Sequence, residues 1–189
     1  MARHVRGSLF VEYVRMLRAA KRVHWEERLS PADAAYLAAR VEDATWYPMD
    51  TFERFGLAIL ETIARGDLEV VRAWGKVTAG SVARRRPELV TEGDPLESLA
   101  RFHGARAGFF DFDAVRLAKL QDGEVRAELA FRMSPPAERA ASYQTMGFFE
   151  GLLGLAGARD VAAEFLASAW QGDQATTLLL TWRPRARRP

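Results

Sequence analysis

The side chains that most often do chemistry are sparse in this chain of 189 residues. It has three histidines, His4, His24 and His103, and none stands at metal-ligand spacing from another histidine or from a carboxylate pair. Cysteine is absent, which excludes thiolate metal sites, disulfides and cysteine nucleophiles. The Gly-x-Ser-x-Gly motif of serine hydrolases is also absent. We therefore expect no catalytic residues, no metal site and no cofactor, and thus a protein that is not an enzyme.

Glu150 is the carboxylate with the most unusual surroundings. It lies in an otherwise apolar run, between Gly147 and Gly151. The simplest interpretation places this side chain on the solvent face of a helix. A buried Glu150 would instead need a partner, and its pKa would be shifted.

Three glycines around this carboxylate are spaced for one face of a helix. Gly147, Gly151 and Gly154 stand at positions i, i+4 and i+7. A glycine inside a helix costs roughly 1 kcal/mol relative to alanine, so a close contact should offset that cost. The stripe predicts a close-packing surface. Either the helix lies tightly on a sheet, or the stripe leaves room for a ligand or a partner helix.

Several aromatic residues could line a pocket for a small apolar ligand, because ligand pockets are mostly apolar. The alternative is that they are ordinary core residues. The candidates are Trp46, Tyr47, Phe109, Phe110, Phe148, Phe149 and Trp170.

The elements that must position these residues begin with helices. Apolar spacing predicts helices over about 8–23, 31–41, 51–63, 68–83 and 95–102. The residues expected to cap their N-termini are Ser8, Ser30, Asp50 or Thr51, and Asp94. Pro48 disfavours helical backbone at Tyr47, which predicts an aromatic turn there.

The second half of the chain changes to the period-two alternation of strands. Val125, Ala127 and Leu129 alternate with charged residues after an Asp-Gly turn, as in a half-buried antiparallel strand. Strands are predicted over about 110–120, 125–131, 161–169 and 176–182, and one helix from Ala137 to Ala156.

This order of elements predicts an α+β fold. An N-terminal helical part, about 8–103, precedes a four-stranded antiparallel ββαββ part, about 108–182, and the sheet packs against helices. We expect one domain over 1–182, followed by a disordered Arg/Pro tail over 183–189.

Charge and hydropathy limit the partners and the location. The net charge is +2, and four arginines lie among the last seven residues, so the basic pI is a property of the end of the chain. A nucleic-acid-binding domain would be expected to show a clustered basic stripe. No stretch approaches the roughly 18 apolar residues of a membrane span, and the N-terminus lacks the pattern of a signal peptide. We expect a cytoplasmic protein with neither a nucleic-acid partner nor a membrane span.

The segment from Phe148 to Trp182 resembles the C-terminal unit of the 4-vinyl reductase-type small-ligand-binding domains. In those domains a glycine-containing helix is followed by a strand, a Gly-Asp turn and a final strand. The segment Tyr47-Pro48-Met49-Asp50 before a helix, and Arg183 after the final tryptophan, are similar to a paralogous family of myxobacterial proteins of about this length. The resemblance implies the superfamily fold of haem–nitric-oxide (H-NOX) sensors and transport-particle subunits. It also implies a hydrophobic cavity between helices and sheet, and a tendency to dimerise.

The departures from these relatives concern their cofactors. Aromatic-sensing members hold zinc through cysteines, and this chain has none. The haem sensors use a proximal histidine, and His103 falls about where that residue would lie. They also carry a Tyr-x-Ser-x-Arg motif for the haem carboxylates. The second strand here reads Leu129-Ala130-Phe131-Arg132-Met133 and lacks that motif.

The sequence thus favours a non-enzymatic, cytoplasmic domain for sensing or protein interaction, which could hold a small apolar ligand between helices and sheet. Two alternatives stay open. One is a homodimeric assembly module without a ligand, and the other is a haem-binding gas sensor that uses His103.

Overall fold

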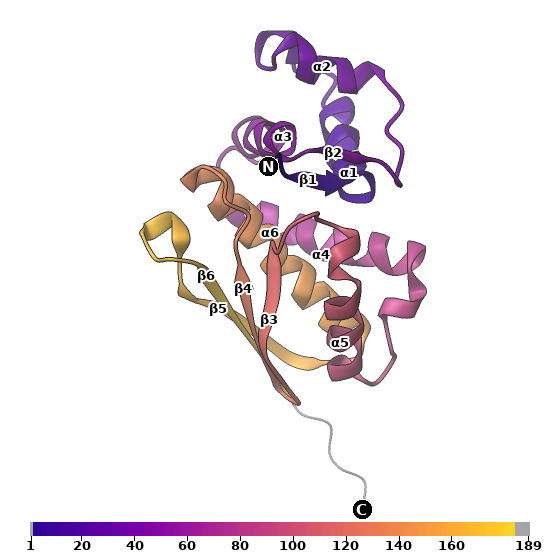
Figure 1. The fold of residues 1–189 in the computed structure, drawn as a ribbon, viewed down its shortest axis with the longest axis vertical. Helices are drawn as coiled ribbons and strands as arrows, with labels where there is room; N and C mark the ends of the chain where they lie inside the picture. The colour runs from indigo at the N-terminus through magenta and orange to yellow at the C-terminus, as the bar shows by residue number, and fades with distance from the viewer. Residues whose placement is uncertain (1, 184–189) are drawn as a thin grey trace, which may run out of the picture. The chain divides into compact units, whose positions relative to one another are not determined.

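The computed structural model describes residues 2–183, and the chain forms two compact units (Figure 1). Unit 1 contains the chain up to Leu68 together with residues 107–113. Unit 2 contains Glu69–Arg106 and the chain from Ala114 onward. The segment 107–113 therefore belongs with the N-terminal helices, although the sequence placed most of it with the strands. A single domain over 1–182 stays a prediction.

Unit 1 is mainly helical. Its helices are α1 (Gly7–Ala19), the 3₁₀ turn η1 (Trp25–Glu27), α2 (Pro31–Ala38) and α3 (Met49–Thr62). Aromatic rings join them: Phe10 of α1 lies 5.4 Å from Phe55 of α3 between ring centroids, and Tyr13 stacks on Phe52 at 4.2 Å. Phe10 and Phe55 are fully buried, so the apolar face of each helix forms the core of this unit.

Two short strands complete unit 1, and the sequence did not predict them. β1 (His4–Arg6) pairs with β2 (Trp46–Pro48) in antiparallel fashion, with Val5 opposite Tyr47. Val5 also forms a bridge to Phe110 on its other side. The predicted aromatic turn at Tyr47-Pro48 is therefore wrong. Pro48 is tolerated because it stands at the end of a two-stranded ribbon, where a missing N–H costs little.

Two of the predicted helix starts, at Ser30 and Asp94, are confirmed, and in both a side chain caps the helix. Ser30 Oγ accepts a hydrogen bond from the Asp33 amide, and Asp94 Oδ1 accepts one from the Glu97 amide. The expected cap at Ser8 is wrong, because α1 begins at Gly7 and backbone carbonyls of residues 43 and 45 accept from its first amides. A Cβ at Gly7 would overlap the Glu42 carbonyl, so this close approach requires glycine. The expected cap at Asp50 or Thr51 is also wrong, since α3 begins at Met49.

Unit 2 is built on a four-stranded antiparallel sheet, which confirms the predicted α+β class. Its strands are β3 (Val115–Gln121), β4 (Glu124–Leu129), β5 (Arg159–Ala167) and β6 (Thr176–Arg183), in the order β3-β4-β6-β5. The predicted alternation holds in β4, because Val125, Ala127 and Leu129 are all completely buried. The first strand begins at Val115 rather than near residue 110.

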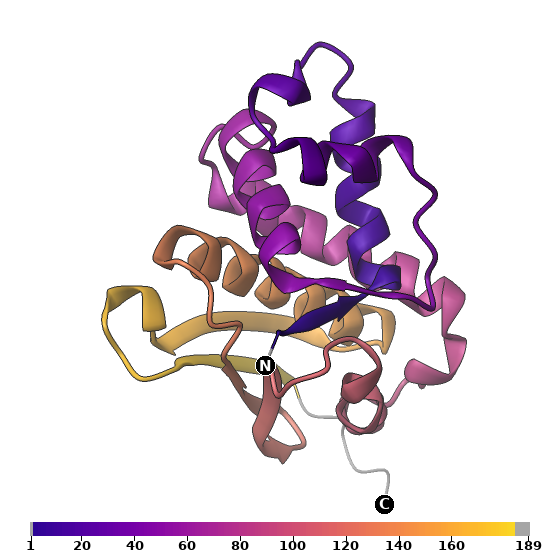
Figure 2. The ribbon, with the colours of Figure 1, turned by 45° about the horizontal axis from the view of Figure 1, so that its top comes forward.

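The helices of unit 2 lie on this sheet and on each other. They are α4 (Leu68–Arg85), η2 (Pro87–Leu89), α5 (Pro95–Ala105), α6 (Pro135–Leu155) and η4 (Ala169–Gln171). The short turn η3 (Arg106–Gly108) begins at the residue that follows α5 and continues into the segment 107–113 of unit 1. α5 packs on β3 and on α6, and α6 crosses over β5 and β6 (Figure 2). One face of the sheet is therefore covered by α5 and α6.

The C-terminal end differs from the sequence prediction by one residue. Arg183 is not the first residue of a disordered tail but the last residue of β6, opposite Arg159. Its guanidinium lies 2.6 Å from the Asp160 carboxylate. Residues 184–189 of the predicted tail lie outside the described residues. Within the described part of the chain, no helix has the length and apolar character needed to cross a membrane.

Candidate functional site

The aromatic candidates of unit 1 form two different contacts. Tyr47 is buried and stacks on Phe10 with 4.4 Å between ring centroids, and its hydroxyl accepts a hydrogen bond from the Glu42 amide. Trp46 is 38% exposed, and the Arg6 guanidinium lies 4.9 Å from the centroid of its ring. Tyr47 is thus a core residue, whereas Trp46 takes part in a surface cation–π pair.

The segment 107–113 holds the other aromatic candidates of unit 1. The Phe109 carbonyl accepts a hydrogen bond from the Arg6 amide, and Phe110 lies 5.6 Å from Phe112 between ring centroids. His4 holds this segment at Asp111, the residue that follows Phe110. The His4 ring lies 2.7 Å from the Asp111 carboxylate, which also accepts the His4 amide. Phe109 is buried beside this strand-like contact.

The candidates of unit 2 belong to two other clusters. Phe148 and Phe149 both contact Phe102 of α5, with 5.3 and 5.2 Å between ring centroids. Trp170 of η4 instead packs on Phe165 and Tyr143. The seven predicted pocket residues are therefore distributed over several aromatic clusters, and a common pocket stays a prediction.

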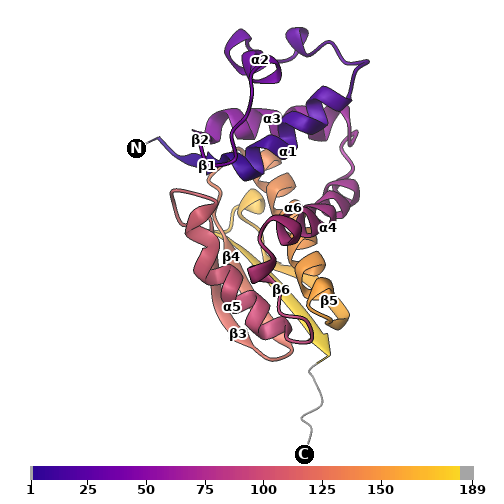
Figure 3. The same cartoon turned by 90° about the vertical axis from the view of Figure 1, so that its right-hand side faces the viewer.

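α6 lies against α4 (Figure 3), and two glycines of its stripe, Gly147 and Gly151, lie at the contact. A Cβ at Gly147 would overlap the Arg72 carbonyl, and one at Gly151 would lie 2.8 Å from Ala79 Cβ. Gly75 of α4 lies equally close to α6, since a Cβ at Gly75 would overlap the Gln144 carbonyl. The contact is therefore backbone against backbone, and its partner is a helix of the same chain rather than the sheet. Gly154 takes no part in it, because a Cβ at this position would meet no atom within 4 Å.

Glu150 lies beside this helix crossing and is buried, so its expected place on the solvent face is wrong. Its carboxylate accepts hydrogen bonds from Arg72 Nε at 2.8 Å and Nη2 at 2.7 Å, and Lys76 Nζ lies 3.3 Å away. Burial acts to raise the pKa of Glu150, but the hydrogen bonds from Arg72, and then the charges of Arg72 and Lys76, outweigh burial, so the pKa is lowered. Glu150 is therefore ionised at neutral pH, and its charge is compensated within unit 2.

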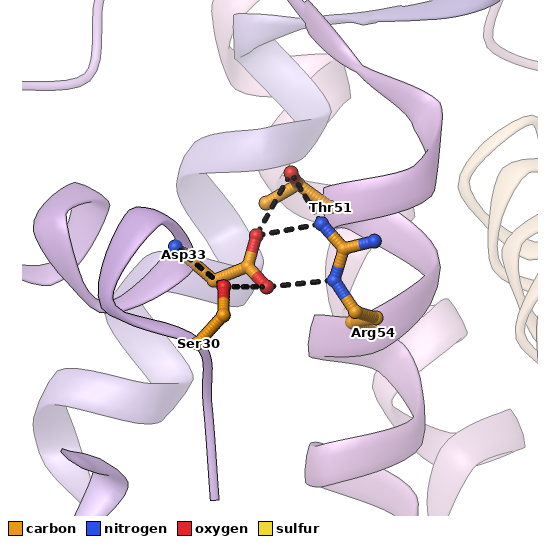
Figure 4. A network of polar contacts seen from close by, with 4 residues as sticks. All are labelled: Ser30, Asp33, Thr51 and Arg54. Atoms are coloured by element: carbon orange, nitrogen blue, oxygen red, sulfur yellow. Dashed lines mark hydrogen bonds and ion pairs between the residues drawn. The ribbon is translucent and has the colours of Figure 1, made fainter.

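Asp33 is a second buried carboxylate, and it lies in a polar network with Ser30, Thr51 and Arg54 (Figure 4). The sequence pointed only to Ser30, which caps the helix. Both of its oxygens accept from the Arg54 guanidinium, at 2.6 and 2.8 Å, and they also accept from the hydroxyls of Ser30 and Thr51. The Arg54 hydrogen bonds, opposed by burial, hold the pKa of Asp33 below its usual range. The network ties α2 to α3. The Ser-Pro-x-Asp start of α2 was a usable signal, but nothing local pointed to Arg54.

A third buried carboxylate, Glu138, holds the turn between β4 and α6. Its Oε1 accepts from the Phe131 amide at 3.0 Å and its Oε2 accepts from the Met133 amide at 2.9 Å. Arg132, between them, has a positive φ of 58°. Two amides on either side of a left-handed residue form a nest, a concave arrangement that binds anions. Glu138 is only 4% exposed, so this nest is filled by the chain itself.

His103 lies near the end of α5, half-buried. Its Nδ1 is buried and has no hydrogen-bond partner among the described residues. Burial, and then the charge of Arg106, lower the pKa of His103, so the imidazole is neutral at pH 7. Arg106 also donates from Nη1 to the His103 carbonyl at 2.6 Å.

The three buried carboxylates described above serve as internal partners. Those of Asp33, Glu138 and Glu150 are each bonded to donors of the same unit. Across residues 2–183, no three side chains of the metal-binding types come together.

Comparison with known proteins gives matches in structure only. Neither a protein-family model nor a curated protein sequence matches the chain. The H-NOX protein from S. oneidensis in its Fe(II)NO ligation state matches with a TM-score of 0.66 and 15% identity, over 94% of this chain and 99% of its own. A mutant of T. Tengcongensis H-NOX matches with a TM-score of 0.62 and 12% identity, over 96% of this chain and 100% of its own.

An oxygen-binding H-NOX domain related to soluble guanylate cyclases, in its oxygen complex, also matches. Its TM-score is 0.63 and its identity 10%, over 97% of this chain and 100% of its own. At such identities the likeness is one of fold, and it extends over nearly the whole chain. This chain therefore has the fold of the H-NOX domains, as the resemblance in its sequence implied.

Proposed function

We propose that this chain is a non-enzymatic sensory or protein-interaction domain that uses the H-NOX fold without haem. The observation that carries the sensory role is the full-length match to H-NOX domains, among them structures with nitric oxide and with oxygen bound. Because the fold alone does not transfer a cofactor, the residues of this chain must be compared with what haem would require.

His103 is the residue to which the sequence resemblance assigns the iron, and its surroundings do not suit that role. A histidine that binds a metal through one nitrogen usually donates its other N–H to a carbonyl or carboxylate. The buried Nδ1 of His103 has no such partner among the described residues.

The segment after β4 does not suit haem carboxylates either. Phe131 stands with its side chain buried, and Met133 offers no side-chain donor. The amides of both residues are already bonded to the Glu138 carboxylate, which would repel a second anion. The residues present do not fit a haem group.

The proposed ligand is instead small and apolar. The cluster of Phe102, Phe148 and Phe149 supports this choice, because three aromatic side chains of α5 and α6 converge there and Phe148 is only half-buried. The proposal includes a cytoplasmic location, on the grounds given by the sequence.

Native mass spectrometry of freshly purified protein tests this function. We expect the mass of the chain plus one small copurified molecule. An empty dimer would replace this proposal by the homodimeric assembly module.

Incubation with haemin tests the cofactor separately. We expect no protein-bound Soret band, and the same spectrum for wild type and His103→Ala. A strong Soret band in the wild type that is lost in His103→Ala would overturn the haem-free proposal.

A further inference from the structure

We propose that the turn between β4 and α6 is a carboxylate-binding site that Glu138 occupies as an internal ligand. This inference deepens the proposed function and rests on it in one respect. In a protein without haem, a carboxylate of the chain itself, that of Glu138, is the acceptor for the amides of this turn. The ligand class that the site accepts is a small monocarboxylate.

The contact is a two-point one, with one carboxylate oxygen on each amide. Oε1 takes the Phe131 amide at 3.0 Å and Oε2 takes the Met133 amide at 2.9 Å. Parallel bonds from two donors to the two oxygens of one group select a planar carboxylate over a spherical anion such as chloride.

The backbone at Arg132 adopts a conformation that is unfavourable for a residue other than glycine. Arg132 adopts the left-handed region, with φ at 58°, and residues other than glycine adopt that region only when their surroundings impose it. The left-handed residue turns the flanking amides to the same side, where both meet Glu138. Both observed bonds come from backbone amides, and the Arg132 side chain is exposed.

Burial makes the occupant necessary. Glu138 is 4% exposed and Phe131 3% exposed, so water has little access to the Phe131 amide. A buried amide without an acceptor is strongly unfavourable. The position of Glu138 in the first turn of α6 adds the favourable field of the helix N-terminus. Removing this side chain should therefore leave a preformed space that an external carboxylate can fill.

Acetate is the matched probe, because Glu138→Ala removes a methylene and a carboxylate, which acetate restores. We expect Glu138→Ala to lower the melting temperature by roughly 5–15 °C. Sodium acetate should then raise it in proportion to the logarithm of acetate concentration, and sodium chloride at equal ionic strength should not. Glu164→Ala, which removes an exposed carboxylate from β5 of the same unit, is the control and should respond to neither salt.

Glu138→Gln keeps the experiment decisive if Glu138→Ala does not fold. Its amide oxygen satisfies one donor and its side chain still fills the space, so acetate should have no effect on its melting temperature. Hydrogen exchange should become faster at one of the two amides, Phe131 or Met133, relative to wild type.

Equal responses of Glu138→Ala to acetate and chloride, or a melting temperature equal to that of wild type, would overturn the proposed site. Unchanged exchange at both amides in Glu138→Gln would do the same. Haem binding by the wild type would refute the proposed function, while the acetate response of Glu138→Ala would still decide the site.

Discussion

Arg72 and Glu150 form a two-point ion pair that joins α4 to α6 at the place where the two helices touch through glycines. The Arg72 side chain is 25% exposed and that of Glu150 7%, so the pair is shielded on the acidic side and partly open on the basic side. Lys76 adds a second positive charge at 3.3 Å. Removing either member of the pair leaves the other without its main partner.

The ion pair can be tested by a double-mutant cycle. Glu150→Ala should lower the free energy of unfolding by about 1–3 kcal/mol, because Arg72 keeps only the exposed Glu69 carboxylate, 3.3 Å from its Nη1. Arg72→Ala should cost a similar amount, since the buried Glu150 keeps only Lys76, at 3.3 Å. The double variant should be more stable than the sum of the two losses predicts. Urea denaturation followed by tryptophan fluorescence measures all four proteins, and strict additivity would contradict the coupling.

The glycine contact predicts opposite effects for two identical substitutions in α6. Gly147→Ala should destabilise the chain by at least about 1–3 kcal/mol, because the new methyl group would overlap the Arg72 carbonyl. Gly154→Ala should stabilise it by up to about 1 kcal/mol, since the position is open and alanine favours the helix. Thermal melting of both variants checks this pair, and equal shifts of the two melting temperatures would refute it.

Asp33 predicts a pH dependence of stability. Its pKa is lower in the folded state than in the unfolded chain, where an aspartate has a pKa of about 3.9. Its contribution is therefore fully present above that pH and is lost as the pH falls through the lower, folded value. Asp33→Asn should be less stable than wild type at pH 7, and the gap should narrow below about pH 4. Urea denaturation at a series of pH values measures the gap, and a constant difference would exclude this role.

Arg18 predicts the stability of the end of α2. Its guanidinium donates to the carbonyls of Tyr36, Leu37 and Ala39 at 3.2, 2.8 and 2.5 Å, which are acceptors that the helix itself leaves unpaired. Arg18→Ala should cost about 1–2 kcal/mol. Arg15 lies in α1, as Arg18 does, and Arg15→Ala removes only an exposed pair with Glu12, so it should cost under about 0.5 kcal/mol. Equal losses in urea denaturation would show that the three carbonyl contacts contribute nothing.

The regular elements could be predicted from the sequence because their signals are local. The alternation at Val125, Ala127 and Leu129 identified β4, and Ser30 and Asp94 located two helix starts. β1 and β2 span three residues each, which is too short for any periodicity to be read. Their pairing depends on residues about 40 positions apart.

The contacts of the buried carboxylates could not be predicted either, for two different reasons. The partner of Glu150 is Arg72, 78 residues earlier, and the sequence gives no sign of this pairing. Glu138 has local partners, but they are backbone amides, which carry no sequence signature. The glycine spacing in α6 predicted a close contact. That α4 is the element in contact became evident only from the positions of Gly75 and Ala79.

The direct contact of the α4 and α6 backbones has a mechanical consequence. Where side chains separate two helices, a small slide can be absorbed by rotamer changes. Here a slide by one turn in the direction that brings Tyr143 or Val71 to the places now held by Gly147 and Gly75 would keep the two backbones apart. The direct contact therefore opposes sliding of α4 against α6 in that direction.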